Sequence, residues 1–339
     1  MRKLSTMTIV VMIFSLLVGC SNKKYVTLGN QRISADATEL QLYGETLTNN
    51  DLLRLSELTS LKKLELSYFL LATDISPISS LTNLTHLELD MCYEISDLSP
   101  LSSLTNLTVL TLANNPLMND LSPLSSATNI NELCLNNNPV KDLSPLSSNK
   151  NLIKLELRNS PISNWSSLSA FVSLEEFFCN DNQISELSPL ERLTNLRILN
   201  LSGNQISDLS SLIGLWRIEE LYLGGFDGNS VSDLTPISNL VNLSTLDLSY
   251  CPIYDISPLS TLTNLTSLYL SSTGVTDLTP LSDLYKLTNL QLTGTFVNDL
   301  LPLSNLKNLE RLNLRGSYYE KTLDLSPVVH VKIVECIQG

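Results

Sequence analysis

One apolar spacing recurs along almost the whole chain and restricts it to a repeat architecture. The pattern L-x-x-L-x-L restarts at residues 37, 61, 84, 107, 130, 152, 174, 196, 218, 243, 265, 287 and 309. These starts are 22 to 25 residues apart, so one supersecondary unit is copied about thirteen times. Units of this length bury a continuous core by stacking on their neighbours, which predicts a solenoid rather than a catalytic domain with an enclosed pocket.

The unit that starts at residue 196 shows how each repeat forms a strand. Leu199 and Leu201 are two residues apart and therefore share one face of a strand, whereas Ile198, Asn200 and Ser202 share the other. The next strand follows after a full coil and runs in the same direction. The sequence therefore predicts a parallel sheet of about 13 strands, on the order of 60 Å long, with leucines turned inward.

A residue that can hydrogen-bond to the backbone stands eight positions into most units. This column comprises Asn115, Asn138, Ser160, Asn182, Asn204, Cys251, Thr273, Thr295 and Ser317. We expect it to form a ladder that satisfies buried amides and carbonyls of the loops. Cys92 and Cys251 occupy the same position and Cys179 replaces an inward leucine, so these three cysteines are interpreted as buried structural thiols.

The prolines and aspartates predict how each coil returns to the sheet. All fourteen prolines occupy two repeat positions, and ten of them lie in four-residue segments, or tetrads, such as S-P-L-S. Proline is tolerated in a first helical turn, which predicts a short 3₁₀ helix in each return path. Aspartates that precede the tetrads can accept bonds from the free amides there: Asp97, Asp120, Asp142, Asp208, Asp233, Asp255, Asp277 and Asp299. A calcium site along this column is the alternative, but one carboxylate per coil favours capping.

The repeats resemble a known bacterial class. Their consensus, L-T-N-L-x-x-L-x-L-x-x-N-x-I-x-D-L-S-P-L-S, is similar to the internalin-type leucine-rich repeats over about 300 residues. The resemblance implies an α/β solenoid, a leucine-rich-repeat horseshoe with a parallel concave sheet and short 3₁₀ helices on the convex side. It also implies that the concave sheet grips host or partner proteins. The chain departs from several internalins because it shows no immunoglobulin-like domain after the repeats and no wall-anchoring signal.

The first twenty residues have the layout of a secretion signal. Arg2 and Lys3 form a basic start, residues 7–18 form an apolar run too short to span a bilayer comfortably, and Cys20 follows Leu-Val-Gly. This ending resembles the lipobox of bacterial lipoproteins, which implies that Cys20 carries acyl chains and becomes the mature N-terminus. An ordinary signal peptide is the alternative. Lipidation would place the protein at the cell envelope, on the outer membrane or cell surface, without a transmembrane helix.

These observations divide the chain into three parts. We expect a lipoprotein signal peptide over residues 1–19, a tether over 20–36, and a leucine-rich-repeat solenoid with terminal caps over 37–339. Solenoid ends expose an apolar cross-section and need capping. A helix over Thr48–Leu58 is expected to cover the first end, and Val328–Val334 is interpreted as the last strand.

Composition argues against catalysis, nucleic-acid binding and a bound cofactor. The net charge of −13 leaves no basic surface for phosphates. We find no G-x-S-x-G, P-loop or G-x-G-x-x-G motif, and the chain has only two histidines, His86 and His330. His86 is expected to face outward near Glu65 and Glu88, where a metal site is possible in principle, but a solvated acidic strip is the favoured interpretation. We therefore expect a protein that is not an enzyme and holds neither cofactor nor metal.

The outward residues of the predicted sheet suggest a binding surface in its later half. Phe178 and Tyr222 should flank Asn200, with Ile198 beside it and Tyr269 two strands beyond Tyr222. Exposed aromatic side chains are enriched where proteins bind. The candidate site is completed by Glu176, Glu220, Asp247 and Phe226, the last within the inserted loop Gly224–Gly228.

The sequence thus predicts a lipid-anchored monomer whose concave sheet binds another protein, as an adhesin would. The acidic residues would attract basic partners. Cross-strand aromatics that only stabilise the sheet are the structural alternative. Two further alternatives stay open: an envelope scaffold that associates with its own kind through its lateral edges, and polysaccharide binding through the aromatic side chains.

Overall fold

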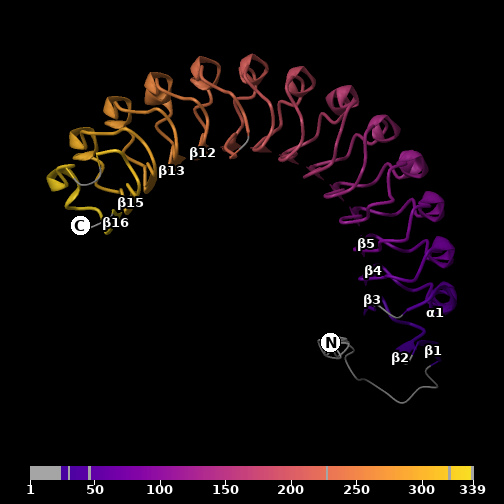
Figure 1. Cartoon of the computed structure of the whole chain (residues 1–339). Coiled ribbons are helices and arrows are strands. Elements are labelled where there is room, and N and C mark those ends of the chain that lie inside the picture. The colour runs from indigo at the N-terminus through magenta and orange to yellow at the C-terminus, as the bar shows by residue number, and fades with distance from the viewer. Residues whose placement is uncertain (1–23, 30, 45–46, 227, 320–321, 337–339) are drawn as a thin grey trace, which may run out of the picture. The chain divides into compact units, whose positions relative to one another are not determined.

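The structure is a computed structural model that describes residues 24–29, 31–44, 47–226, 228–319 and 322–336. The chain divides into two compact units, Met1–Phe171 and Val172–Gly339. Both are built from stacked repeats in which a strand, a 3₁₀ helix and two connecting loops form one coil (Figure 1). The predicted leucine-rich-repeat solenoid is therefore confirmed for each unit.

The first unit contains an antiparallel hairpin and six parallel strands. The hairpin consists of β1 (Tyr25–Leu28) and β2 (Gln31–Ser34). The parallel strands are β3 (Glu39–Tyr43), β4 (Lys63–Ser67), β5 (His86–Asp90), β6 (Val109–Thr111), β7 (Glu132–Cys134) and β8 (Lys154–Glu156). The helices are α1 (Asn49–Leu52), η1 (Leu53–Glu57), η2 (Ser76–Ser80), η3 (Ser99–Ser103), η4 (Ser122–Ser126), η5 (Ser144–Leu146) and η6 (Ser166–Ala170).

The second unit contains eight parallel strands. They are β9 (Glu176–Phe178), β10 (Ile198–Asn200), β11 (Glu220–Tyr222), β12 (Thr245–Asp247), β13 (Ser267–Tyr269), β14 (Asn289–Gln291), β15 (Arg311–Asn313) and β16 (Ile333–Glu335). The 3₁₀ helices are η7 (Ser188–Leu190), η8 (Ser210–Leu212), η9 (Thr235–Ile237), η10 (Ser257–Thr261), η11 (Thr279–Leu281), η12 (Leu301–Leu303) and η13 (Ser326–Val328). Within each unit the helices lie on the side opposite the strands (Figure 1).

The apolar period produces the core as the sequence predicts. In β10 the central residue, Leu199, is fully buried, as is Leu201 beyond it, whereas Ile198 and Asn200 on the other face are half-buried. Leu199 pairs in register with Leu221 of β11, so leucines of successive coils stack in columns. Burial of one such side chain contributes about 1.5–3 kcal/mol, and the columns run the length of each unit.

The predicted polar ladder joins neighbouring coils. Asn115 donates from Nδ2 to the carbonyl of Leu89 at 2.8 Å, and its own amide donates to Asn138 Oδ1 at 2.8 Å. In the second unit, Ser317 Oγ donates to the carbonyl of Leu292 in the preceding coil at 2.8 Å. These side chains are buried, so each bond satisfies a backbone group that would otherwise be left without a partner.

The aspartate column caps the 3₁₀ helices. Asp208 Oδ1 accepts the backbone amide of Ser210 at 2.8 Å, and Asp277 Oδ1 accepts that of Thr279 at 2.8 Å. The same bond recurs at the other predicted positions, at 2.8 to 2.9 Å. The column therefore serves the backbone, in agreement with the capping interpretation.

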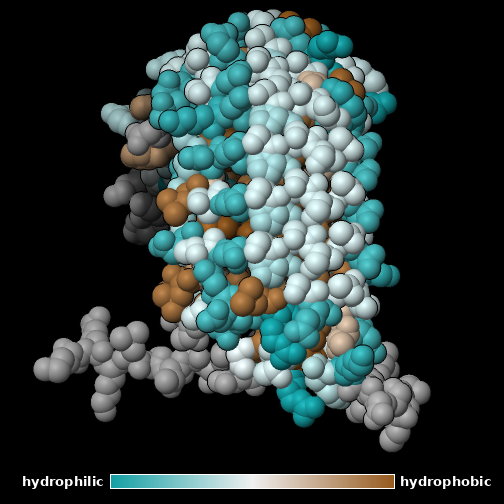
Figure 2. Space-filling view, turned by 90° about the vertical axis from the view of Figure 1, so that its right-hand side faces the viewer, coloured by the Kyte–Doolittle hydropathy of each residue, from teal (hydrophilic) through white to brown (hydrophobic). Residues whose placement is uncertain are grey.

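The helix side of the first unit is polar. Figure 2 views this side and shows mainly pale and teal surface with small, scattered hydrophobic groups. The pale colour reflects the serine and proline residues of helices such as η3 and η4. This face therefore offers no extended apolar surface among the described residues.

The N-terminal end differs from the expected tether. Residues 20–23, which include Cys20, lie outside the described residues, as does the signal peptide. The later part of the expected tether forms an ordered hairpin of β1 and β2, in which Val26, Leu28 and Ile33 are buried. β1 contacts η1, so the hairpin covers the apolar end of the first repeat. The expected helix over Thr48–Leu58 is present as α1 and η1.

The C-terminal end differs from the prediction in register. Val328 ends the 3₁₀ helix η13, and the last strand, β16, begins only at Ile333. The interpretation of Val328–Val334 as one strand was wrong because the S-P-V sequence at 326–328 repeats the S-P-L helix signal of the other coils. β16 pairs in parallel with β15 and so forms the edge of the second unit.

Candidate functional site

The sheet of the second unit presents two rows of solvent-facing side chains. In each strand the central residue points into the core, and the first and third residues face outward. The third residues form one row, aligned by the strand register: Phe178, Asn200, Tyr222, Asp247 and Tyr269. The first residues form the second row: Glu176, Ile198, Glu220, Thr245 and Ser267. We call these two rows the sheet site.

The sheet site brings together eight of the nine residues proposed from the sequence. At about 4.8 Å between strands, Phe178 and Tyr269 lie roughly 20 Å apart across five strands. These eight side chains are half-buried on the outward face of the sheet. Phe226 is the exception. It lies in the loop after β11, is 81% exposed, and packs edge-on against Tyr250 with ring centroids 5.4 Å apart.

Hydrogen bonds hold both tyrosines of the sheet site. Tyr222 donates its hydroxyl to Glu220 Oε2 at 2.6 Å, and the hydroxyl of Tyr269 accepts from Asn289 Nδ2 at 3.1 Å. Partial burial, together with the bond to Glu220, raises the pKa of Tyr222 above its ordinary value. Tyr222 therefore stays neutral at physiological pH, and its hydrogen bond, like that of Tyr269, restrains the orientation of the ring.

The two polar members of the aromatic row also stabilise the ends of their strands. Asn200 Oδ1 accepts the amide of Ser202 at 3.0 Å, and Asp247 Oδ1 accepts that of Ser249 at 2.9 Å. The carboxylate of Asp247 lies so close to Gly224 that a Cβ there would be 2.9 Å from its Oδ1. Gly224 therefore makes room for the acidic group, a role that the sequence analysis missed although a glycine directly after a strand can signal such an approach.

An arginine pairs with two acidic groups next to the sheet site. Arg197 Nη2 contacts Glu219 Oε2 at 2.8 Å, and its Nη1 lies 3.8 Å from Glu175 Oε2. Each of these glutamates directly precedes a strand, whereas Glu176 and Glu220 occupy the first strand positions and face the site. The negative charge of the site itself is thus carried by Glu176, Glu220 and Asp247.

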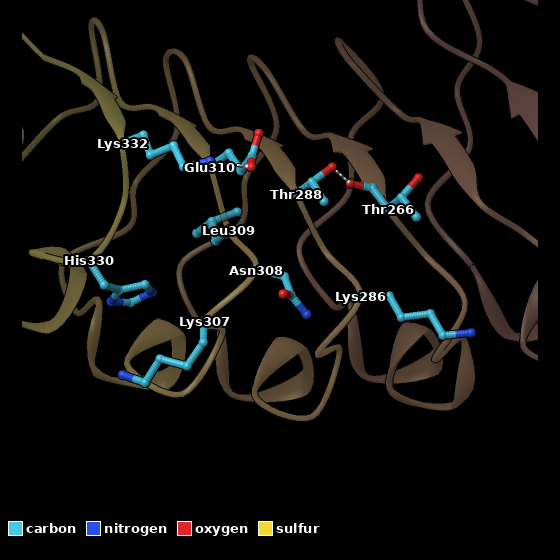
Figure 3. A pocket seen from close by; sticks show the side chains of 9 residues that line it. All are labelled: Thr266, Lys286, Thr288, Lys307, Asn308, Leu309, Glu310, His330 and Lys332. Carbon is cyan, nitrogen blue, oxygen red and sulfur yellow. Dashed lines mark hydrogen bonds and ion pairs between the residues drawn. The ribbon is translucent and has the colours of Figure 1, made fainter.

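A hollow of about 520 Å³ lies on the side of the second unit where helices lead into strands (Figure 3). Its lining includes Lys286, Lys307 and Lys332, but their side chains point apart rather than toward one centre. Each ammonium has a protein partner, Asn264 Oδ1, the Ser304 carbonyl and Glu310 Oε1, respectively, all at 2.6 Å. His330, also in the lining, lies 2.9 Å from the carbonyl of Leu306. The hollow therefore shows no convergent set of groups for an anion.

The remaining candidate for chemistry in the first unit is the acidic strip around His86. Glu65 and Glu88 are paired neighbours on β4 and β5, and burial followed by the charge of Glu65 raises the pKa of Glu88. His86 Nδ1 lies 2.8 Å from Thr85 Oγ1. Across the described part of the chain, no three His, Cys, Asp or Glu side chains are grouped to hold a metal ion.

The cysteines are placed as structural residues. Cys92, Cys179 and Cys251 are buried, as predicted, and Cys134 is half-buried on β7. Burial raises the pKa of Cys92 and Cys251 to about 12 and that of Cys134 to about 11. These thiols remain protonated at neutral pH and are poor nucleophiles.

Comparisons with known proteins place the chain among bacterial repeat proteins. A family model for paired leucine-rich repeats matches residues 172–214, 194–239 and 241–283. The internalin InlF of Listeria monocytogenes is 30% identical, with 91% of each chain covered and a TM-score of 0.81. Internalin C2 of the same organism is 33% identical over 56% of this chain and 82% of its own, with a TM-score of 0.51.

A leucine-rich-repeat protein of Leptospira interrogans shares the fold at 20% identity, with 88% of this chain and 90% of that chain covered and a TM-score of 0.69. No curated protein sequence matches the chain. No helix among the described residues is long and apolar enough to cross a bilayer.

Proposed function

Because the chain belongs to the internalin-like leucine-rich-repeat family, we propose that it binds another protein through the sheet site of its second unit. Internalin-like repeat proteins are non-enzymatic binding proteins and are typically exposed on the bacterial surface. The proposal adds to this general role a particular surface, formed by Phe178, Ile198, Tyr222 and Tyr269 with Glu176, Glu220 and Asp247.

The observation that carries the proposal is the unbroken row of Phe178, Asn200, Tyr222, Asp247 and Tyr269 on the outward face of the sheet. The core is filled by inward leucines such as Leu199 and Leu201, so the aromatic side chains of this row are not needed to fill it. Aromatic side chains dominate the energetics of protein interfaces when they are placed near the centre of a contact.

Hydrogen bonding prepares this surface for binding. Tyr222 is tied to Glu220, and Tyr269 to Asn289, so less side-chain entropy is lost when a partner orders them. The carboxylates of Glu176, Glu220 and Asp247 lie among the aromatics and would accelerate encounter with basic partners. We therefore propose a partner whose contact surface combines apolar groups with lysine or arginine.

The decisive experiment is a pull-down from the natural environment of the bacterium. It compares the wild-type chain with a double variant that carries both Phe178→Ala and Tyr222→Ala. The variant is expected to lose the proteins that the wild type captures. Tyr285→Ala is the matched control, because Tyr285 is an exposed tyrosine outside the sheet. Capture of the same proteins by the double variant would refute the sheet site, provided that circular dichroism shows an intact fold.

For the N-terminus we propose lipidation at Cys20, supported by the basic start, the apolar run and the cysteine position. Acyl chains on one cysteine would hold the protein on a membrane surface. Cys20→Ser should move the protein from the membrane fraction to the soluble fraction and abolish palmitate labelling. Retention of label in the variant would contradict the assignment. Protease accessibility on intact cells then distinguishes a surface-exposed protein from one that faces the periplasm.

A further inference from the structure

Six exposed aromatic residues lie outside the sheet site, in the described loops of the second unit that lead from strand to helix: the pair Phe226 and Tyr250, and four more. Tyr254 and Tyr318 are each 74% exposed, Phe296 is 46% exposed and Tyr319 is 39% exposed. They belong to the coils that follow β12, β14 and β15. We call these four residues the rim strip.

The rim strip is held together by contacts between successive coils. The rings of Phe296 and Tyr318 have centroids 5.8 Å apart, and those of Tyr318 and Tyr319 are 5.0 Å apart. The ring of Tyr254 lies directly on Gly274, where a Cβ would be 2.3 Å from the ring. The coil that carries Gly274 is in turn bonded to the next one, because the amide of Phe296 donates to the carbonyl of Val275 at 3.2 Å.

These rings do not serve the core. Ile253 and Val297, which neighbour the strip residues in sequence, are fully buried and fill the apolar interior. Equivalent loop positions in other coils carry small residues such as Ser230 or Gly274. The fold therefore does not require aromatic groups here, and a run of exposed rings indicates an interaction surface.

Charge distinguishes the two lateral sides of the second unit. Between each strand and the following helix, the described residues carry eight acidic side chains and a single basic one, Arg315. Arg315 Nε lies 3.5 Å from Glu335 Oε2. The other seven described lysines and arginines of the unit lie between a helix and the start or first residue of the next strand: Arg192, Arg197, Arg217, Lys286, Lys307, Arg311 and Lys332.

The acidic side chains accompany the strip coil by coil. Asp255, Asp277 and Asp299 occupy the same position in three successive coils, and Asp255 directly follows Tyr254. Each accepts one backbone amide through Oδ1, at 2.8 Å. The hydrogen bond with Thr279 lowers the pKa of Asp277, which remains ionised at neutral pH.

We propose that the rim strip docks an extended, lysine- or arginine-bearing polypeptide segment of a partner. Cationic side chains would stack on the exposed rings of Tyr254, Phe296 and Tyr318, and each such pair raises affinity by about two- to five-fold at exposed sites. The aspartate column would attract the same cations along the direction of the strip. A nucleic acid is repelled by this charge, and a neutral sugar gains nothing from it.

The probe is a fluorescein-labelled nona-arginine peptide, titrated with the full chain in detergent and followed by fluorescence anisotropy at about 150 mM NaCl. Tyr254→Ala combined with Tyr318→Ala should weaken binding by about five-fold or more, the product of two lost cation–π contacts. Tyr285→Ala, which removes an exposed tyrosine from the opposite rim, should leave binding unchanged. Tyr254 and Tyr318 are each 74% exposed, so the double variant should fold normally.

A second variant separates charge from aromatic stacking. Asp255→Asn, Asp277→Asn and Asp299→Asn, combined, retain a side-chain oxygen that can accept a hydrogen bond at the start of the helix; at the equivalent position of another coil, Asn164 Oδ1 accepts the hydroxyl of Ser166 at 2.8 Å. This variant should bind the peptide more weakly and with a smaller dependence on salt. Phe178→Ala with Tyr222→Ala should leave peptide binding intact, because the sheet site is a separate surface.

Three results would overturn the proposal. The first is equal peptide affinity of the wild type and the double tyrosine variant. The second is binding of a neutral hexasaccharide of N-acetylglucosamine through Tyr254 and Tyr318 with no binding of the peptide. The third is tyrosine-dependent self-association in sedimentation velocity without peptide binding, which would make a second copy of the chain the occupant. Loss of peptide binding in the sheet-site variant instead would place the cationic segment on the sheet.

Discussion

Replacement of Asn204 tests whether the polar ladder stabilises the solenoid. Asn204 is 1% exposed; besides a longer bond from Nδ2 to the carbonyl of Ser202 at 3.3 Å, its side chain makes three bonds, to the preceding coil and within its own coil. Its Oδ1 accepts the amide of Ile184 at 3.1 Å, and its Nδ2 donates to the carbonyls of Cys179 at 3.0 Å and Leu201 at 2.9 Å. Asn204→Ala removes all three bonds while leaving the backbone free to keep its path.

The three lost bonds are not equivalent. The carbonyl of Cys179 keeps a bond from Asn182, and that of Leu201 keeps one from Asn229, both at 2.9 Å. The amide of Ile184 has no second acceptor among the described residues. A buried amide without a partner costs about 1–3 kcal/mol, and the lost donor bonds add about 1 kcal/mol, so the free energy of unfolding should fall by about 2–4 kcal/mol.

Urea unfolding followed by circular dichroism measures the change, with fluorescence as a second probe to test for a single transition. Asn242→Ala is the matched control. Asn242 is exposed and makes one side-chain bond, to the carbonyl of Trp216 at 2.9 Å, so its loss should cost about 0.5–1 kcal/mol. Asn204→Thr should fall between the two, since a hydroxyl donates one hydrogen where the amide group of asparagine donates two. Equal losses for the alanine variants at 204 and 242 would refute the role of the ladder.

Two further predictions concern titration and thiol chemistry. Hydrogen bonds at the caps lower the pKa of Asp208 and Asp277 in the folded state. The two ionised carboxylates therefore stabilise the fold at pH values above their unfolded pKa, and this contribution is lost as the pH falls through their folded pKa. The urea midpoint should decrease below about pH 4, and it should decrease less after Asp→Asn replacement at both positions. Cys92, Cys179 and Cys251 should react with iodoacetamide only after unfolding, as peptide mapping would show; labelling of any of them in the native protein would contradict their structural interpretation.

The fold could be predicted because one physical requirement repeats in every coil. Leucine at positions two apart fixes both the strand and the face that is buried, and the recurrence of the same leucine motif in each unit then fixes the register. The alignment of Phe178, Asn200 and Tyr222 follows from that rule and is confirmed. The sheet rows could therefore be placed from the sequence, although their role in binding stays a prediction.

Features outside the period were harder to predict. Asn229 fills the ladder after the inserted loop, with Nδ2 donating to the carbonyls of Leu201 and Leu223, but the insertion shifts it out of the counted position. The hairpin β1–β2 was taken for part of a tether because no repeat marks it, yet the open end of the first coil provides its apolar contact surface. Tyr254 and Phe296 were missed because loop side chains follow no strand alternation, and only coordinates show which rings meet.

The ladder bonds have a consequence for how such a protein can diversify. The side-chain oxygen and nitrogen of Asn115 bond to backbone groups of the preceding coil, and each coil supplies backbone groups of this kind. A complete coil can therefore be deleted or duplicated without leaving a buried polar group unpaired. Unequal recombination between gene segments that encode these units would change the distance between Phe178 and Tyr269 in steps of one strand, about 4.8 Å. Selection could then change the spacing of these binding residues while the leucine pattern that directs folding stays unchanged.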